Sequence, residues 1–395
     1  MTFRPDPATL AVRASLESDT QHGAVIPPLH LSSNYTFAAL GEKRQYDYSR
    51  SGNPTRDALA DALTSLEGGE ATVVTSSGMA ALTLVLQLLE PGDLLIAPHD
   101  CYGGSYRLFD SLAKKGQFKV VFVDQTDTAA LERAVAEEPR LILVETPSNP
   151  LLRIVDITKV AALAKSCDAL LAVDNTFLSP VLQQPIALGA DIVIHSTTKY
   201  LNGHSDVVGG AVIAASKKLG EELAWWANCL GITGAPFDSY LTLRGIRTLH
   251  TRMRQHQETA QALAEILDGH PGVKRVYYPG LETHEGHDIA CRQQSGFGGM
   301  LSFEIEGGEA AVRAFVGSLQ YFSLAESLGG IESLVCHPTT MTHAAVSDAA
   351  LSEAGIGRNL IRLSVGLEAA GDLQADLLAG LDVASHAVTQ LRAVV

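Results

Sequence analysis

A lysine surrounded by hydroxyl side chains, Lys199, follows a short apolar segment at residues 192–194. Its neighbours include Ser196 and Thr198. A lysine amine attacks an aldehyde only after it loses a proton, and an apolar or cationic pocket favours that loss by lowering its pKa. Hydroxyl groups beside it could bind a phosphate. Taken alone, such a lysine is more often a solvated surface residue, so its interpretation depends on what other segments bring to it.

Three other apolar segments are followed by residues that could do chemistry. Gly78 and Met79 lie in a small-residue turn before a helical pattern, and such a turn offers free backbone N–H groups to an anion. Asp174 ends an apolar segment, where burying a carboxylate is costly unless a partner such as a protonated ring nitrogen bonds it. Tyr102 offers an aromatic face after a further segment. The ordinary alternatives are a capping turn at Ser77 and a turn residue at Asp174.

Together these residues supply the parts that pyridoxal 5'-phosphate (PLP) requires from a protein. The parts are an anion site, a ring to stack on, a carboxylate for the pyridinium nitrogen and an amine for the aldehyde. The turn at residues 75–79 is not a Walker A loop, because no Gly-Lys-Ser/Thr follows it, and the chain has no G-x-G-x-x-G fingerprint. The combination therefore points to PLP.

The elements that must position these residues alternate along the chain. Apolar segments predict buried strands, and the stretches 128–137 and 157–166 between them have helical patterns; the segments are residues 73–74, 94–96, 120–123, 141–144, 170–173 and 192–194. Strands alternating with helices predict an α/β fold with a mainly parallel sheet. Ligands bind such sheets at the carboxyl ends of the strands, which is where the candidate residues lie.

The rest of the chain divides around this region. Residues 1–60 are rich in turn formers and aromatics and predict an ordered N-terminal arm that packs on something else; the resemblance described below implies that this is a neighbouring subunit. Residues 61–250 form the predicted PLP-binding large domain. Residues 251–395 predict a smaller α+β C-terminal domain, with strands at 273–278, 300–305 and 361–365 and helices at 309–319 and from 372 onward. A long helical pattern at 247–267 joins the two.

Composition excludes several classes of function. The chain of 395 residues has 29 Lys and Arg against 44 Asp and Glu, a net charge of -15, so a nucleic-acid partner is disfavoured. Five scattered cysteines predict neither a disulfide framework nor a zinc site, and they fit a reducing cytoplasm. No signal peptide is evident, and no apolar stretch is long enough to span a membrane. Histidine spacing at 284–287 does not favour a metal site.

The segment Ser196-Thr197-Thr198-Lys199-Tyr200-Leu201-Asn202-Gly203-His204 resembles the lysine signature of the Cys/Met metabolism PLP-dependent enzyme family. The resemblance covers nearly the whole chain, and its further motifs are at residues 48–55, 66–69, 77–80, 102–104, 173–176 and 324–330. It implies PLP fold type I, the aspartate-aminotransferase-like fold. It also implies a homotetramer, built as a dimer of dimers with shared active sites.

The resemblance implies a role for each site residue. Lys199 would bind the PLP aldehyde and move protons, Asp174 would face the pyridinium nitrogen, and Tyr102 would stack on the ring and assist proton transfer. The implied phosphate ligands are Gly78, Met79, Ser196 and Thr198 of the same subunit, with Tyr48 and Arg50 of the neighbouring subunit. The implied substrate ligands are Arg362 for the α-carboxylate, with Asn149 and Ser327 as its helpers. Taken alone, Arg362 could be an ordinary strand-edge arginine and Asn149 a turn residue. The resemblance disfavours both of these alternatives.

The reaction implied is a γ-replacement. O-Succinyl-L-homoserine and L-cysteine would give L-cystathionine and succinate, a step of methionine biosynthesis by transsulfuration. Glu326 could hold the ammonium of cysteine or of the distal part of cystathionine, or could be a plain surface residue. Arg107, with Arg50, could pair with the succinyl carboxylate or with the second substrate.

Other functions remain open at this point. The nearest alternative function is γ-cleavage of cystathionine to cysteine, 2-oxobutanoate and ammonia. The next alternative is direct sulfhydrylation of an acylhomoserine. Glu326 disfavours β-cleavage of cystathionine but not γ-cleavage. A non-catalytic PLP-fold binding protein is a different class, against which the intact Lys199, Asp174, Tyr102 and Arg362 argue. The preferred acyl ester and the balance between synthesis and cleavage are not fixed by the sequence.

Overall fold

The computed structural model describes residues 5–344 and 348–394, and its central feature is a seven-stranded sheet. The strand order is β1-β7-β6-β5-β4-β2-β3. The bounds are β1 Ala71–Thr75, β2 Leu94–Pro98, β3 Lys119–Val123, β4 Leu141–Glu145, β5 Leu170–Asp174, β6 Ile192–His195 and β7 Gly210–Ala214. Strands β3, β2, β4, β5 and β6 are parallel, whereas β7 runs antiparallel to both β6 and β1. The predicted α/β fold with a mainly parallel sheet is confirmed.

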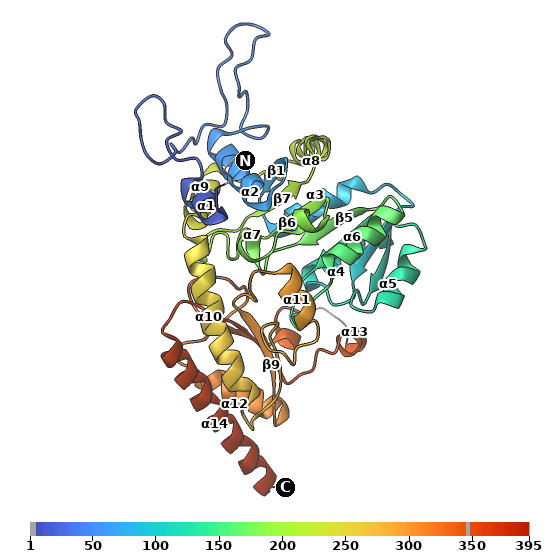
Figure 1. Ribbon diagram of the computed structural model, residues 1–395, viewed down its shortest axis with the longest axis vertical. Coiled ribbons are helices and arrows are strands. Elements are labelled where there is room, and N and C mark those ends of the chain that lie inside the picture. The colour runs from blue at the N-terminus through green and yellow to red at the C-terminus, as the bar shows by residue number, and fades with distance from the viewer. Residues whose placement is uncertain (1–4, 345–347, 395) are drawn as a thin grey trace.

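Helices cover both faces of this sheet (Figure 1). The described helices are α1 Pro7–Arg13, α2 Pro54–Glu67, α3 Gly78–Val85, α4 Gly103–Lys114, α5 Thr128–Val135, α6 Ile157–Ser166, α7 Ser179–Leu182, α8 Lys217–Leu230, α9 Pro236–Ile246, α10 Leu249–Asp268, α11 His287–Gln293, α12 Gly308–Ser318, α13 Asp348–Glu353 and α14 Ala370–Val394. In β4, Leu141 and Leu143 pack toward α3 and α4, whereas Ile142 and Val144 pack toward α5 and α6. Both faces are buried, so the strands read as unbroken apolar runs.

A second sheet of five strands follows α10 in the described chain. Its order is β10-β11-β12-β9-β8, with β8 Val273–Tyr277, β9 Met300–Ile305, β10 Ser323–Leu324, β11 Leu334–Cys336 and β12 Leu360–Ser364. Side chains of α10, α12 and α14 pack on it around Phe303 and Phe315. The proposed domain division at 250/251 falls in the first turn of α10, the helix that runs between the two sheets (Figure 1).

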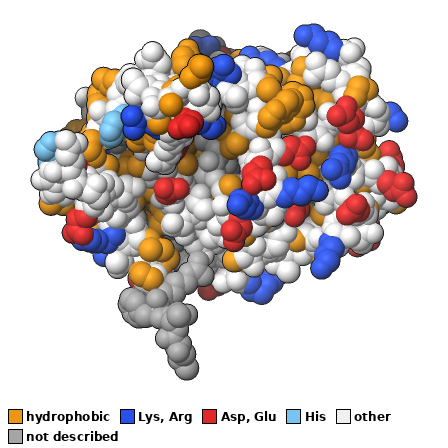
Figure 2. Space-filling model, turned by 90° about the horizontal axis from the view of Figure 1, so that it is seen from above, with side chains coloured by type: hydrophobic (Ala, Val, Ile, Leu, Met, Phe, Trp, Pro, Cys, Tyr) orange, Lys and Arg blue, Asp and Glu red, His pale blue; other side chains and the backbone are white. Residues whose placement is uncertain are grey.

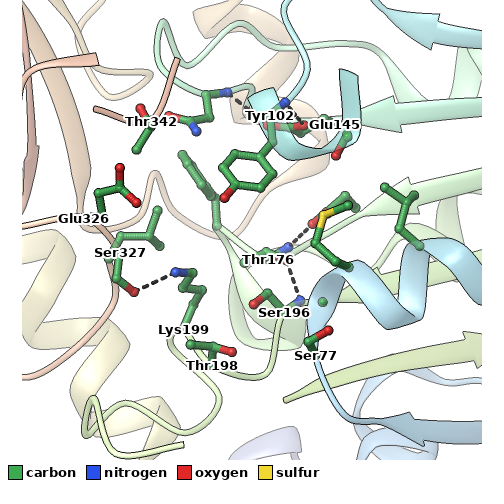
Figure 3. A pocket seen from close by; sticks show the side chains of 18 of the residues that line it. Ser77, Tyr102, Glu145, Thr176, Ser196, Thr198, Lys199, Glu326, Ser327 and Thr342 are labelled. Atoms are coloured by element: carbon green, nitrogen blue, oxygen red, sulfur yellow. Dashed lines mark hydrogen bonds between the residues drawn. The ribbon is translucent and has the colours of Figure 1, made fainter. Parts of the chain in front are cut away.

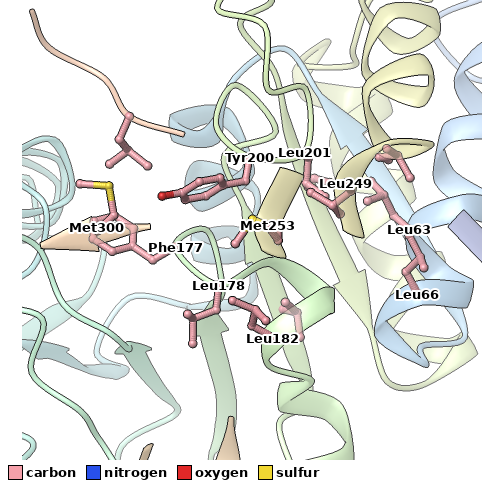
Figure 4. Packing of buried hydrophobic residues seen from close by; sticks show 14 of the residues in the cluster. Leu63, Leu66, Phe177, Leu178, Leu182, Tyr200, Leu201, Leu249, Met253 and Met300 are labelled. Atoms are coloured by element: carbon pink, nitrogen blue, oxygen red, sulfur yellow. The ribbon is translucent and has the colours of Figure 1, made fainter. Parts of the chain in front are cut away.

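A core cluster beneath the predicted lysine joins the two sheets (Figure 4). Tyr200 and Leu201 are 0% and 2% exposed and pack with Leu249 and Met253 of α10 and with Met300 of β9. Fully burying one such side chain stabilises the fold by about 1.5–3 kcal/mol. Lys199 is therefore attached to a rigid base rather than to a free loop.

The N-terminal arm projects from the body as long loops between α1 and α2 (Figure 1). Its apolar side chains are exposed, among them Val25, Leu31, Phe37 and Leu40. Viewed from this end, basic and acidic side chains are interspersed with apolar ones (Figure 2). An apolar arm without a core of its own fits the predicted contact with a second subunit. Among the helices that the structure describes, none has the length and hydropathy of a membrane span.

Candidate active site

A cavity of about 350 Å³ lies where the carboxyl ends of the central strands face the second sheet. Figure 3 shows side chains from both sheets pointing into it. Of the predicted site residues, the cavity lining contains Gly78, Met79, Tyr102, Asn149, Asp174, Ser196, Thr198, Lys199, Glu326, Ser327 and Arg362. The described part of the lining does not contain Tyr48, Arg50 or Arg107.

The Lys199 amine points into the cavity and donates a hydrogen bond to Ser327 Oγ, at 2.6 Å (Figure 3). Burial lowers the pKa of Lys199 to about 8, helped by the positive charge of Arg362 and opposed by the negative charge of Glu326. An ordinary lysine has a pKa of about 10.4, so it presents roughly one neutral amine in 250 at pH 8. Near pH 8 about half of the Lys199 amine is neutral, which is the form that attacks an aldehyde.

The lowered pKa of Lys199 sets an expected pH profile for PLP capture by the apoenzyme. The rate should rise with pH, because deprotonation makes the nucleophile, and should level off above a midpoint near pH 8. Glu326→Gln should move this midpoint to lower pH, because the carboxylate charge raises the pKa of Lys199. Stopped-flow absorbance measures both, with N-acetyl-lysine as the reference amine. A midpoint near 10 for the protein would contradict the assignment.

Two carboxylates lie side by side at the ends of neighbouring strands. Asp174 of β5 pairs in register with Glu145 of β4. Asp174 accepts a hydrogen bond from the Thr176 N–H at 2.9 Å, and burial raises its pKa. Within the described residues, neither carboxylate forms a salt bridge. A buried carboxylate without a salt-bridge partner is suited to bind a cationic group of a ligand, such as a protonated ring nitrogen.

The first turn of α3 provides an anion site. Ser77 caps the helix by accepting the Ala80 N–H at 3.0 Å. The N–H groups of Gly78 and Met79 find no acceptor among the described residues. A Cβ at position 78 would lie 2.8 Å from Ser196 Cβ, so only glycine lets the helix and the lysine loop close around a ligand. Free N–H groups at a helix N-terminus suit a phosphate.

Tyr102 directly precedes α4 and its ring lies over the cavity (Figure 3). Tyr102 is 39% exposed, and its backbone N–H donates to Glu145 Oε2 at 3.1 Å. A Cβ at position 104 would lie 2.5 Å from the Tyr102 ring, so Gly104 leaves room for it. With the anion site, the Asp174 carboxylate and the Lys199 amine, the ring completes a set of residues that fits PLP.

Arg362 reaches the same cavity from β12. Its Nη1 donates to Asn149 Oδ1 at 2.7 Å and its Nη2 donates to the Ser327 carbonyl at 3.0 Å. The side chain is 2% exposed, and its Nε has no partner among the described residues. Ser327 adopts a φ of +87°, an uncommon conformation for a residue with a side chain. In that conformation its hydroxyl bonds Lys199 while its carbonyl bonds Arg362, which leaves a buried cation free to bind a carboxylate.

The three predicted residues outside the described lining lie elsewhere on this chain. Arg50 Nη1 donates to the Asn228 carbonyl and to Asn228 Oδ1, each at 2.7 Å, at the end of α8. Tyr48 is half exposed on the arm, and Arg107 is exposed on α4. The structure thus brings together the residues implied for one subunit except Arg107, and it leaves apart Tyr48 and Arg50, which were implied for the neighbour.

Glu145 and Thr176 also line the cavity, although neither was among the predicted site residues. Glu145 follows the apolar segment of β4 in the way that Asp174 follows that of β5, so the same strand-end rule would have found it. Thr176 links two site residues: its N–H donates to Asp174, and its Oγ1 accepts the Ser196 N–H at 2.9 Å. A threonine two residues past a strand has no comparable signal.

The fold and the site define a PLP-dependent enzyme of fold type I. The chain matches the model of the Cys/Met metabolism PLP-dependent enzyme family over residues 8–382 and belongs to this family. It is 58% identical over 379 residues to cystathionine gamma-synthase of Escherichia coli, covering 96% of this chain and 98% of that one. It is also 49% identical over 374 residues to cystathionine beta-lyase of Lactococcus lactis, covering 95% of this chain and 98% of that one.

Among solved structures, the chain is similar to cystathionine gamma-synthase from Xanthomonas oryzae pv. oryzae in complex with cystathionine. The identity is 60% and the TM-score 0.97, with 98% of this chain and 100% of that chain covered. Relatives that make cystathionine and relatives that cleave it therefore share this fold and much of this sequence.

Proposed function

We propose that this enzyme catalyses a γ-replacement in which cysteine displaces succinate from O-succinyl-L-homoserine to give L-cystathionine. The observation that carries the proposal is the placement in one cavity of the Lys199 amine and the Arg362 guanidinium, whose Nε has no partner among the described residues; Ser327 bonds both. Similarity to cystathionine gamma-synthases supports the choice of reaction within the family. The product would enter methionine biosynthesis by transsulfuration.

The side chains divide the work of this reaction. PLP, when bound, supplies an electron sink for the charge that develops on the amino-acid substrate. Arg362 holds the α-carboxylate in a fixed geometry, supported by Asn149. Lys199, released as a neutral amine, takes the proton from Cα and later returns it. Tyr102 moves the proton of the substrate amine. A proton also leaves Cβ, and the electron pair it leaves behind forms a Cβ–Cγ double bond as succinate departs from Cγ with its own bonding pair. The cysteine thiolate then adds to Cγ, and protons return to Cβ and Cα.

The cofactor contacts follow from the same cavity. Asp174 remains ionised beside the pyridinium nitrogen, so the ring keeps its positive charge. Gly78, Met79, Ser196 and Thr198 bind the phosphate from one subunit. We propose that Tyr48 and Arg50 reach the same phosphate from a neighbouring subunit, in a tetramer built from two such dimers.

Glu326 lines the cavity opposite Tyr102 (Figure 3), and we propose that it binds the ammonium group of cysteine. Glu326→Gln should raise the KM for cysteine about 10- to 100-fold, because a hydrogen bond to a charged group contributes about 1.5–3 kcal/mol. The KM for O-succinylhomoserine should change little. Steady-state kinetics at saturating co-substrate measure both values. Glu332→Gln, on the same loop, is the control, and an unchanged cysteine KM in Glu326→Gln would refute this role.

Arg107 on α4 and Arg50 on the arm are proposed to pair with the succinyl carboxylate. Both are exposed on the single chain, so both are available to a site completed by a second subunit. The arm could form the contact with that second subunit, because its apolar side chains are exposed in the single chain.

Mixing Arg50→Ala and Lys199→Ala variants tests the shared site. Half of the randomly mixed dimers contain both variants, and one of the two sites in each is then intact, so about a quarter of the wild-type activity should return. Activity assays after subunit exchange, verified by native mass spectrometry, measure this. Hybrids that form without regaining activity would place Arg50 in its own subunit's function.

The reaction itself is tested by product analysis of the PLP-loaded enzyme. O-Succinylhomoserine with cysteine should give cystathionine and succinate in equal amounts. Formation of 2-oxobutanoate as the main product would indicate elimination instead. O-Acetylhomoserine in place of the succinyl ester tests the acyl preference.

All five cysteines, which lie within the described residues, are free, and we propose a cytoplasmic location on that basis.

A further inference from the structure

Glu145 connects two parts of the site that lie on different segments. Its Oε2 accepts the Tyr102 N–H at 3.1 Å, and its Oε1 accepts the Asn149 N–H at 3.2 Å. Tyr102 begins the segment whose ring lies over the cavity, and Asn149 is the residue that receives Arg362 Nη1. One carboxylate therefore fixes the backbone at the ring stack and at the partner of the guanidinium.

The position of Glu145 is an electrostatically costly one. It lies directly across from Asp174 in the β4–β5 register and projects on the same face of the sheet. Burial and the negative charge of Asp174 raise the pKa of Glu145 well above its ordinary range. A neutral or apolar residue there would relieve this repulsion, so stability of the fold alone does not favour a carboxylate. What the carboxylate adds is two acceptor oxygens for two N–H groups of different loops.

We infer that Glu145 is a positioning residue that couples the cofactor-stacking ring of Tyr102 to the carboxylate site formed by Arg362 and Asn149. The inference rests on the proposed roles of those three residues. It goes beyond those roles because it assigns one residue, Glu145, to the positioning of both sites. Weakening one contact of Glu145 should therefore disturb cofactor binding and carboxylate binding together. Glu145 acts through the two backbone N–H groups whose hydrogen bonds it accepts.

Glutamine at position 145 provides the sharpest substitution. It retains the size of the side chain but replaces one acceptor oxygen by an NH₂ group, which cannot accept from an N–H. One of the two backbone donors then faces a donor. Losing one of these hydrogen bonds should cost about tenfold in an equilibrium constant, which corresponds to about 1.4 kcal/mol. Glu304→Gln is the matched control, because that carboxylate bonds Tyr277 and Lys274 away from the cavity.

The experiment measures binding rather than turnover. The PLP dissociation constant is obtained from absorbance, and the PLP-loaded enzyme is then titrated with glycine and with methylamine by the change in its visible spectrum. Glycine has the α-carboxylate and no leaving group, whereas methylamine lacks the carboxylate. Glu145→Gln should weaken PLP binding about tenfold and should weaken glycine binding about tenfold more than methylamine binding. Glu304→Gln should leave all three constants unchanged.

A double-mutant cycle separates positioning from general damage. If Glu145 acts on the carboxylate site through Asn149, its effect on glycine binding should shrink in an Asn149→Ala background. Additive effects would overturn the inference, as would an equal loss for glycine and methylamine or an unchanged PLP constant. Should Glu145→Gln fail to fold, Glu145→Asp retains both oxygens at shorter reach and must show the same selective loss of glycine binding. Failure of the γ-replacement would appear instead as missing cystathionine with these constants intact, so the two failures are distinguishable.

Discussion

Replacing Lys199 with alanine is expected to abolish cystathionine formation, lowering the rate by roughly 10³-fold or more. The substitution removes both the amine that binds the PLP aldehyde and the base that moves the Cα proton. No other lysine amine among the described lining residues can take over these two roles, because the lysine that lines the cavity is Lys199. The measurement combines a steady-state assay with borohydride treatment, which should fix the cofactor to the wild-type chain alone.

The control for this variant is Lys217→Ala, which removes an exposed amine on α8 and should retain full activity and full borohydride fixation. Tyr200 and Leu201, which anchor the loop, are unchanged in Lys199→Ala, so the fold should persist. A Lys199→Ala protein that still forms the borohydride-fixed adduct would overturn the site assignment. Loss of borohydride fixation with normal turnover would show that Lys199 binds the cofactor but is not needed for the reaction.

Replacing Asp174 with asparagine is expected to have opposite effects on the apoenzyme and on the PLP-loaded enzyme. Burial raises the pKa of Asp174 above the value of an unfolded chain, so in the apoenzyme its ionised form at neutral pH opposes folding. Stability from this group falls as pH rises from the unfolded to the folded pKa, and asparagine removes the penalty. With PLP bound, the ion pair to the ring is lost, at a cost of about 3–5 kcal/mol, or roughly 10²- to 4 × 10³-fold in affinity.

Differential scanning fluorimetry with and without PLP measures this contrast. Asp174→Asn should raise the Tm of the apoenzyme, reduce the increment that PLP adds, and lower kcat by more than tenfold. Asp110→Asn, a surface carboxylate on α4, should change none of these appreciably. A variant with the same PLP-induced increment in Tm as the wild type would show that Asp174 does not face the ring.

Strand ends carried most of what the sequence could predict about the site. Lys199, Asp174 and Gly78 each follow an apolar segment, and parallel strands bring their carboxyl ends to one edge, so their convergence follows from the pattern alone. Helix and strand positions in the central region agree closely, as for α6 at Ile157–Ser166. These predictions succeed because hydrophobic periodicity is local information.

Other features depended on distant parts of the chain. Strand β7 was not predicted, and its antiparallel place between β1 and β6 comes from tertiary pairing. Arg362 lies 213 positions from Asn149, and nothing near it in sequence indicates the bond between them. Glu145 was visible to the strand-end rule, but the sequence does not indicate its bond to the Tyr102 N–H, which lies 43 positions away, or its bond to the Asn149 N–H in the loop after β4. The roles of Tyr48 and Arg50 at a neighbouring subunit's site, and of Arg107 in substrate binding, remain predictions.

The proposed preference of the enzyme for making cystathionine over cleaving it is tested by comparing two specificity constants on one preparation. The PLP-loaded enzyme is supplied with O-succinylhomoserine plus cysteine, and separately with cystathionine alone. We expect kcat/KM for γ-replacement to exceed that for cleavage by at least tenfold, a difference of about 1.4 kcal/mol between the two transition states. Faster turnover of cystathionine alone would contradict the account and assign the site to cleavage.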